Sequence, residues 1–332
     1  MADVLVTEPS VDAPGVPRPR RVDNNPSRVD RWFDRITLGS GLFVLVLLLL
    51  VGIFLLQRSR PALSESGFSF FTREGWRTDV RPPEIGVLGL LTGTVIVATI
   101  AVTIALPLGV LSALFITQYA SARFRTYLTS MVDLLAAIPS LIFGIWGFLY
   151  LSPQMAPLSE WISQHFGWIP IFHVDKGARF TGSMFIAGVV VALMVVPIIA
   201  SVVREVFAQT PPGEKEAALA LGSTRWGMIR TVVLPFGKGG IIGGSMLGLG
   251  RALGETIAVA LLLPQVPEIT AKILQTGGAT VSGFIVLRAG ADAFTTSGLM
   301  AAGLVLFLIT LGTNMVASIV VSRSRSGVGV DV

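Results

Sequence analysis

The chain has 332 residues, of which 52% are hydrophobic and only 14% are charged. A soluble domain carries roughly 25% charged residues, so this composition excludes a soluble enzyme, a disordered regulator and a nucleic-acid-binding protein. The lack of cysteine excludes disulfides, zinc–thiolate sites and iron–sulfur clusters. No metal site is expected, because His165 and His173 have no ligand partners near them in the sequence. The high hydrophobic fraction and the low charged fraction together predict a multi-pass membrane protein.

Apolar windows of about 20 residues with few or no charges indicate membrane helices, and the chain has enough of them for six spans. Residues 1–35 are predicted to form a flexible tail, because they are rich in Pro, Asp and Arg and lack a hydrophobic period. We expect an all-α membrane domain over residues 36–322, and after it a short tail over residues 323–332. We expect the spans at residues 36–57, 90–117, 131–152, 181–204, 239–263 and 297–321, and a structured loop over residues 205–238.

The charges between the spans predict the orientation. Six spans place both termini on one side, and most of the 25 Lys and Arg residues fall on that side. The positive-inside rule therefore places both termini in the cytoplasm, although the first outer loop also carries several arginines. Asp133, at the start of the third span, is expected to pair with Arg123 or Arg125.

Prolines and glycines mark the predicted spans. Pro107, Pro139 and Pro197 lie inside spans two, three and four, where proline kinks a helix and neighbouring helices re-satisfy the freed backbone groups. Small residues four apart let helix backbones approach closely, so the fifth span is expected to be central and tightly packed. Its packing glycines are Gly240, Gly244, Gly248, Gly250 and Gly254.

The loop over residues 205–238 has the pattern of two short helices. A helical run over Gly213–Leu221 is predicted to end at Gly222, which supplies a left-handed residue. Ser223 or Thr224 can cap a second helix, which is expected to stop near Pro235. A short capped helix with charged flanks is suited to lie in a groove of another protein. The sequence contains no phosphate-binding motif G-x-x-x-x-G-K-[ST], so ATP binding by this chain itself is not expected.

Within this loop, Glu216-Ala217-Ala218, Gly222 and Val232-x-Leu234-Pro235 resemble the EAA signature of bacterial ABC importer permeases. The one departure is Val232, where the signature has isoleucine. The resemblance implies a type I ABC importer permease (MetI-like) architecture, in which this loop is the coupling helix that docks into a cleft on the ATPase subunit. It assigns the coupling role to Glu216, Ala217, Ala218 and Gly222.

A second resemblance narrows the family. The run Gly250–Val259 looks like the fifth-span signature of PstC-type permeases of the phosphate-specific ABC importer, and the resemblance extends over about residues 30–325. It implies ATP-driven import of inorganic phosphate through the bacterial cytoplasmic (inner) membrane. It also implies the partners: a PstA-type second permease, two PstB-type ATPase subunits and an extracytoplasmic PstS-type phosphate-binding protein. ATP and Mg would belong to the ATPase subunits, with no cofactor and no catalysis in this chain. Further matching positions are Trp76, Gly93-Thr94, Ile138-Pro139-Ser140 and Gly144.

Arg251 and Glu255 are charges inside the fifth span. A rise of about 1.5 Å per residue from Gly240 places Arg251 about 16 Å into a hydrocarbon core about 30 Å thick, where a charge must be paired or face water. In one interpretation, the two side chains neutralise each other or neighbouring helices and only hold the bundle together. In the other, Arg251 offers its donor fork to phosphate oxygens along the substrate pathway, and Glu255 orients it. Thr256 and Ser140 are assigned to the same pathway.

Two alternatives stay open. A permease for another oxyanion, such as sulfate or molybdate, would share the fold and the coupling helix. An ATPase-independent channel or an ion-coupled carrier would need no docking helix, and it would more often show repeat-related broken spans with several acidic residues.

Overall fold

The computed structural model describes residues 28–78, 80 and 83–324 of the chain. The internal contacts divide the chain into two compact units, one up to Val51 and one from Gly52 on. Residues 28–51 form a continuous helix whose side chains are all exposed. An exposed apolar helix of this length is what a lipid-facing segment requires.

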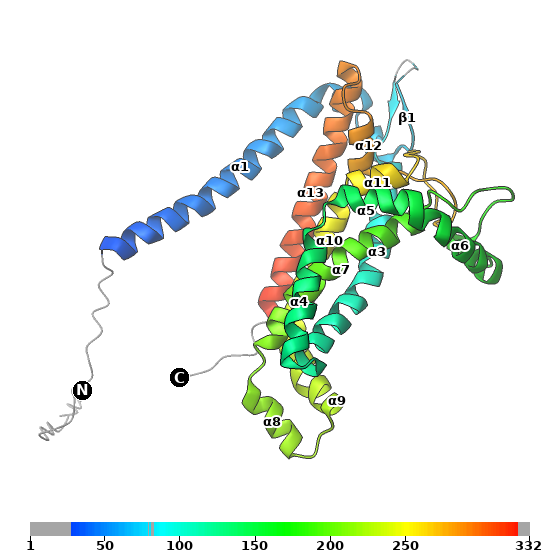
Figure 1. The fold of residues 1–332 in the computed structure, drawn as a ribbon. Coiled ribbons are helices and arrows are strands. Elements are labelled where there is room, and N and C mark those ends of the chain that lie inside the picture. Colours follow the sequence, from blue (N-terminus) through cyan, green and yellow to red (C-terminus); the bar gives the residue numbers. More distant parts are fainter. Residues whose placement is uncertain (1–27, 79, 81–82, 325–332) are drawn as a thin grey trace, which may run out of the picture. The chain divides into compact units, whose positions relative to one another are not determined.

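From Gly52 on, the chain is a helical bundle with one two-stranded sheet at its end (Figure 1). The strands pair antiparallel, with Trp76 opposite Ile85. In chain order, the elements are α1 (Arg28–Ser66), α2 (Ser69–Thr72), β1 (Trp76–Arg77), β2 (Glu84–Ile85), α3 (Leu88–Leu114), α4 (Ala122–Ala137), α5 (Ser140–Trp146), α6 (Ser152–Phe166), α7 (Met184–Ala208), α8 (Pro212–Ala220), α9 (Arg225–Met228), α10 (Leu234–Gly254), α11 (Ile257–Leu262), α12 (Val281–Leu287) and α13 (Ala293–Ser324).

Six helical segments of the described chain are long and apolar enough to cross a membrane, which confirms the predicted six-span, all-α class. The first begins at Arg28, so residues 28–35, expected in the tail, are helical. Val29, Trp32, Phe33 and Ile36 recur there with a helical period. Residues 1–27 and 325–332, where the tails were predicted, lie outside the described residues. The six segments are Arg28–Ser66, Leu88–Tyr119, Ser140–Phe166, Met184–Ala208, Arg225–Gly254 and Ala293–Ile319.

The third span differs from its predicted range of 131–152. The helix stops at Ala137, Ile138 is extended with ψ 128°, and α5 begins after Pro139. A residue before proline is disfavoured in the α region, so Pro139 separates two helices where the sequence analysis expected a kink within one. The apolar segment long enough to span therefore starts at Ser140.

The second helix of the 205–238 loop also differs, because the expectation that it stops near Pro235 is wrong. It continues from α9 through a π-helical turn at Ile229–Val233 into α10. Pro235 is the second residue of α10, directly after the π-helical turn, so its missing N–H falls where the hydrogen-bond pattern changes from π-helical to α-helical. The loop is therefore joined to the fifth span by unbroken helix.

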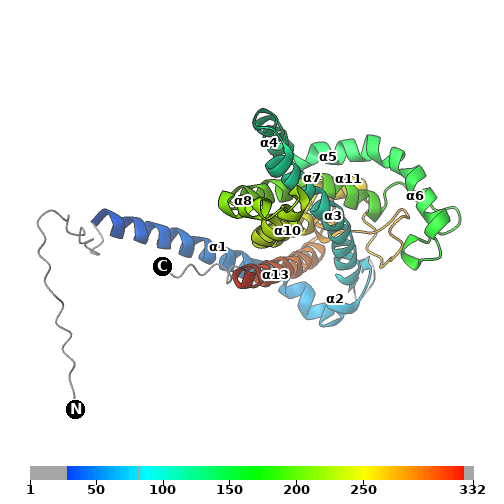
Figure 2. The same cartoon turned by 90° about the horizontal axis from the view of Figure 1, so that it is seen from below.

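Helix α7 is the centre of the bundle. It packs against α3, α10, α4 and α11, and Figures 1 and 2 both show α3, α7 and α10 side by side. Val190, Ile199 and Phe207 of α7 are fully buried in the larger apolar core. A second core joins α2, the two strands, α12 and α13, with Trp76 packed on Phe284 at 5.2 Å between ring centroids.

The predicted pairing of Asp133 with Arg123 or Arg125 is wrong. Asp133 Oδ1 lies 3.4 Å from Nη2 of Arg204 on α7, because α4 packs along α7. Arg125 instead donates from Nε to the Ile116 carbonyl and from Nη2 to the Thr117 carbonyl, both at 3.1 Å. Arg125 thus caps carbonyls of the π-helical turn (Phe115–Tyr119) that follows α3.

Candidate functional site

The fifth span is broken at Glu255. Helix α10 ends at Gly254, Glu255 is extended with φ −64° and ψ 129°, and α11 begins at Ile257. Non-helical backbone at membrane depth is tolerated only where protein buries it or where it lines a water-filled cavity. The break is therefore a constrained feature of the fold, and the sequence analysis, which treated residues 239–263 as one span, did not predict it.

The buried Glu255 side chain lies at the start of α11. Its Oε1 accepts a hydrogen bond of 3.4 Å from the backbone N–H of Ala258, as a helix-capping carboxylate does. The Glu255 carbonyl accepts a 2.6 Å bond from Ser282 Oγ on α12. Thr256, half-buried, donates from Oγ1 to the Gly254 carbonyl at 2.9 Å. The freed backbone groups of the break are thus partly satisfied by side chains.

A shell of buried polar side chains supports the break. Gln265 donates from Nε2 to the Val259 carbonyl at 3.2 Å and accepts at Oε1 from the Thr280 N–H at 3.1 Å. Thr94 of α3 accepts from the Val281 N–H at 3.0 Å. Because buried polar networks are costly unless each member is paired, these bonds fix the loop after α11 relative to α3 and α12.

Gln265, Thr280 and Ser282 were not predicted from the sequence as members of this shell. Gln265 has a left-handed backbone, with φ 55°, between Pro264 and Val266. A glutamine beside a proline at the end of an apolar run was the available signal, but one of its partners, Thr280, lies 15 residues away in the chain. Only the tertiary fold brings them together.

Arg251 is exposed on the last turn of α10. Its guanidinium makes no hydrogen bond or ion pair with Glu255 or with any other residue that the structure describes, because the chain turns away after Gly254. Leu247, Ile257 and Leu261 are also exposed along α10 and α11. An arginine in an apolar span must face water or a partner, so this face of the two helices is the candidate pathway surface. Ser140 is half-buried at the start of α5, which packs against α11.

Three of the five predicted packing glycines of α10 lie against α7. A Cβ added to Gly240 would lie 2.5 Å from Val206 Cγ2, and one added to Gly248 would lie 2.7 Å from Val195 Cγ1. Gly244 is looser, at 3.3 Å from Val203. The other two predicted positions differ: a Cβ at Gly250 meets only Asn314 Oδ1 at 3.6 Å, and one at Gly254 meets nothing within 4 Å.

Helix α8 forms the end of the bundle away from the strands (Figure 1). It ends as the sequence predicted, because Gly222 has φ 87° and the N–H groups of Gly222 and Ser223 bond to the carbonyls of Leu219 and Ala218. Thr224 caps α9 by accepting from the Gly227 N–H at 3.1 Å. Exposed on α8 and its turn are Glu216, Ala217, Leu219, Leu221 and Gly222, with Ala218 half-buried.

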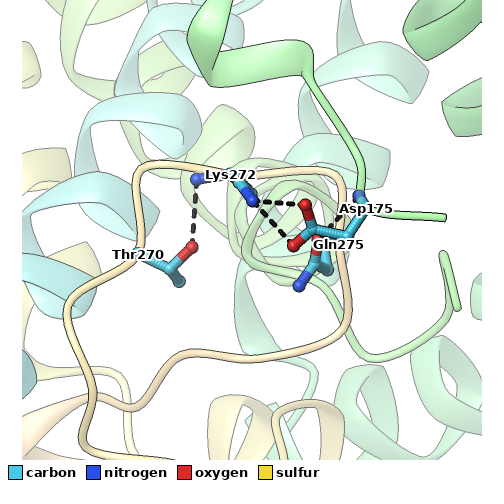
Figure 3. A network of polar contacts seen from close by, with 4 residues as sticks. All are labelled: Asp175, Thr270, Lys272 and Gln275. Atoms are coloured by element: carbon cyan, nitrogen blue, oxygen red, sulfur yellow. Dashed lines mark hydrogen bonds and ion pairs between the residues drawn. The ribbon is translucent and has the colours of Figure 1, made fainter. Parts of the chain in front are cut away.

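At the other end, an ion pair ties two loops together (Figure 3). Lys272 Nζ, in the loop between α11 and α12, donates to both carboxylate oxygens of Asp175 at 2.6 Å, in the loop before α7. The Asp175 N–H donates to Gln275 Oε1 at 3.2 Å. The hydrogen bond from Lys272 lowers the pKa of the Asp175 carboxyl below its ordinary value of 3.8.

This ion pair predicts a pH dependence. Because the folded pKa of Asp175 is depressed, the contact orders the loops above the ordinary pKa and loses that effect as the pH falls through the lowered value. Backbone hydrogen exchange in residues 264–280, corrected for intrinsic rates, is expected to accelerate as the pH falls below 3.8, the ordinary pKa value of the Asp175 carboxyl. Lys272→Met should exchange faster at pH 5 and lose most of the pH dependence, whereas Lys176→Met should match the parent chain. Equal profiles for the parent and Lys272→Met would contradict the prediction.

Together these features define a multi-pass membrane protein with a broken fifth span and a projecting two-helix loop. Residues 105–326 match the family described as binding-protein-dependent transport system inner membrane component. The chain belongs to this family. It is 37% identical over 328 residues to the phosphate transport system permease protein PstC 2 of Mycobacterium tuberculosis, covering 97% of this chain and all of the relative. The corresponding PstC of Xylella fastidiosa (strain Temecula1) is 36% identical over 310 residues, covering 91% of this chain and 93% of the relative.

Two solved structures share the fold. The MetNI methionine ABC transporter, in an inward-facing conformation, aligns with TM-score 0.50 and 18% identity over 72% of this chain and 94% of that chain. A bacterial ABC transporter involved in import of the acidic polysaccharide alginate aligns with TM-score 0.51 and 19% identity over 88% of this chain and 99% of that chain. At these identities the likeness concerns the fold alone, and it confirms the predicted MetI-like permease architecture.

Proposed function

We propose that the chain is a permease subunit that forms half of the translocation pathway of an ATP-driven importer of inorganic phosphate. The observation that carries this proposal is the 37% identity, over 97% of the chain, to a permease protein of a phosphate transport system. The chain itself performs no covalent chemistry in this proposal. Its role is to alternate between bundle arrangements that open the pathway to one side or the other.

The proposed assembly contains a homologous second permease, two ATPase subunits and an extracytoplasmic phosphate-binding protein in the inner membrane of a bacterium, with both termini of this chain cytoplasmic. The family description, an inner membrane component of binding-protein-dependent transport, supports this arrangement. ATP and Mg would bind the ATPase subunits. An exposed Arg251 in an apolar span supports a pathway shared with a second permease, because a lone chain leaves this cation without a partner among its described residues.

Substrate uptake by the assembled complex tests the proposal. Proteoliposomes that contain the complex are given ATP in the compartment into which the ATPase subunits project. Labelled phosphate should accumulate in that same compartment. Excess unlabelled phosphate should abolish the signal, while sulfate and molybdate at the same concentration should leave it nearly unchanged. Stronger competition by sulfate or molybdate would favour the other oxyanion, and uptake without ATP or the ATPase subunits would favour a channel or carrier.

Coupling through α8 gives a second prediction. A cysteine placed at the exposed Ala217 should form a disulfide with a cysteine in the cleft of the ATPase subunit, because an exposed helix with no described neighbour on this face is free to enter a groove. This chain has no cysteine of its own, so the introduced cysteine is its one site of cross-linking. Ser64→Cys, exposed on α1, is the matched control and should not cross-link. Absence of any Ala217→Cys cross-link in an assembled, active complex would count against docking.

A further inference from the structure

A polar cavity of about 290 Å³ lies beside α8, apart from the break in the fifth span. It is formed by the turn after α3, by α4, by the end of α7 and by one residue of α8. Its size suits a small ligand. The lining residues are Ile116, Thr117, Gln118, Arg125, Thr129, Arg204, Glu205, Phe207, Ala208 and Lys215.

Three cations from three different helices converge on this cavity. Arg125 comes from α4, Arg204 from α7 and Lys215 from α8. Among the lining residues, Glu205 alone carries a negative charge, and it is exposed. The only carboxylate bonded to these cations in the described chain is Asp133, on Arg204. The cavity therefore has an excess of positive charge.

Each cation keeps donors for a ligand. Arg125 uses Nε and Nη2 on backbone carbonyls, which holds its guanidinium in place and leaves Nη1 without a partner in the described chain. Arg204 reaches a single oxygen of Asp133 at 3.4 and 3.5 Å, and that carboxylate is 53% exposed. A long contact to a solvated carboxylate contributes little. Arg204 itself is only 16% exposed, so its side chain is largely removed from bulk water.

Lys215 is half-buried, and its side-chain ammonium makes no hydrogen bond or ion pair with any residue that the structure describes. Removing an ammonium group from water without a compensating anion is unfavourable. Thr129 adds a hydroxyl with no described partner, and Gln118 adds an amide that bonds only to Thr117 at 3.2 Å. Two guanidinium groups, an ammonium and hydroxyl donors around one small space match the oxygens of a phosphoryl group.

We propose that this cavity binds one phosphate-type oxyanion, either free inorganic phosphate or the phosphate of an anionic lipid headgroup, and that the ligand ties α8 to the ends of α3, α4 and α7. Lys215 is the link, because it is the only lining residue on α8. Binding restrains α8 and so makes its position sensitive to the anion. The proposal does not depend on which ion the protein transports.

Hydrogen exchange of the full complex in nanodiscs tests the proposal. One arm uses zwitterionic phosphatidylcholine nanodiscs with and without inorganic phosphate. The other arm adds phosphatidylglycerol to the nanodisc and omits phosphate. We expect exchange at the α8 amides to slow on the order of tenfold at about ten times Kd, because stabilisation follows the factor 1 + [L]/Kd. Protection by phosphate alone identifies the free ion, and protection by phosphatidylglycerol alone identifies a headgroup.

The variant Lys215→Gln separates this site from general salt effects. It should lose the protection in both arms, while Lys238→Gln, an exposed cytoplasm-proximal residue of α10 outside the cavity, should keep it. Thr129→Val, which removes a donor without changing charge, should weaken the apparent affinity for phosphate. The proposal is overturned if neither anion slows exchange in α8, or if Lys215→Gln and Lys238→Gln respond alike.

Discussion

Replacing Arg251 with glutamine is expected to lower phosphate uptake by the assembled complex by roughly 10- to 100-fold. Hydrogen bonds to charged groups contribute about 1.5–3 kcal/mol, and each 1.4 kcal/mol corresponds to about a factor of ten. Arg251 is exposed on α10 and its side chain is bonded to no residue of the described chain, so replacing it should remove substrate contacts more than bundle stability. Initial rates of labelled phosphate uptake, at matched amounts of assembled complex, measure the effect.

Two further variants test whether the loss of uptake comes from lost phosphate binding by the guanidinium of Arg251. Arg251→Lys keeps the charge but loses the planar donor fork, so it should also lose uptake if phosphate is bound through two parallel bonds. Lys238→Gln, on the same helix, is the control and should transport normally. ATP hydrolysis by each variant complex should stay coupled to the binding protein. Normal phosphate uptake by Arg251→Gln would contradict a role of Arg251 in the pathway and would favour a structural role for it.

Glu255 has a different role from Arg251 in this structure, although four residues separate them in the sequence. The sequence spacing predicted one helical turn between them, and hence the possibility of mutual neutralisation. Glu255 instead caps the six-residue α11 and anchors the break through Ser282. The two charges are thus separated by a change in backbone conformation that follows Gly254, and each needs its own explanation.

Local sequence patterns predicted the elements that depend on neighbouring residues. The end of α8 at Gly222 and the cap at Thr224 are set by backbone conformation and side chains within a few positions, and both were predictable. The six-span class followed from the scarcity of charge, because an apolar stretch of this length has few alternatives to a membrane helix.

The features that were not predicted depend on residues far apart in the chain. Asp133 finds Arg204 because α4 packs along α7, and no local pattern encodes this contact. Gln265 bridges Val259 and Thr280 only after the chain has folded back. Pro235 read locally as a helix stop, yet the π-helical turn before it lets the helix continue. Tertiary packing decided the first two contacts, whereas a local change of helix type accompanies the continuation at Pro235.

Replacing Gly248 with alanine is expected to destabilise the protein by about 1–3 kcal/mol, the usual cost of overpacking a core. The added Cβ would lie 2.7 Å from Val195 Cγ1 and 3.0 Å from Ile199 Cδ1, and both of these α7 side chains are fully buried and cannot move aside. Part of that cost is offset by about 0.5–1 kcal/mol, because alanine favours a helix interior over glycine.

Gly243→Ala is the matched control, because it lies on the same helix with nothing within 4 Å of an added Cβ. It gains the helix preference without the clash, so it should be neutral or more stable. Gly248→Ala should therefore lower the midpoint of heat-induced unfolding of the purified protein, whereas Gly243→Ala should leave it unchanged or raise it. A common shift would mean that α10 can move away from α7 at little cost, and that the close approach of these two helices does not hold the fifth span in place.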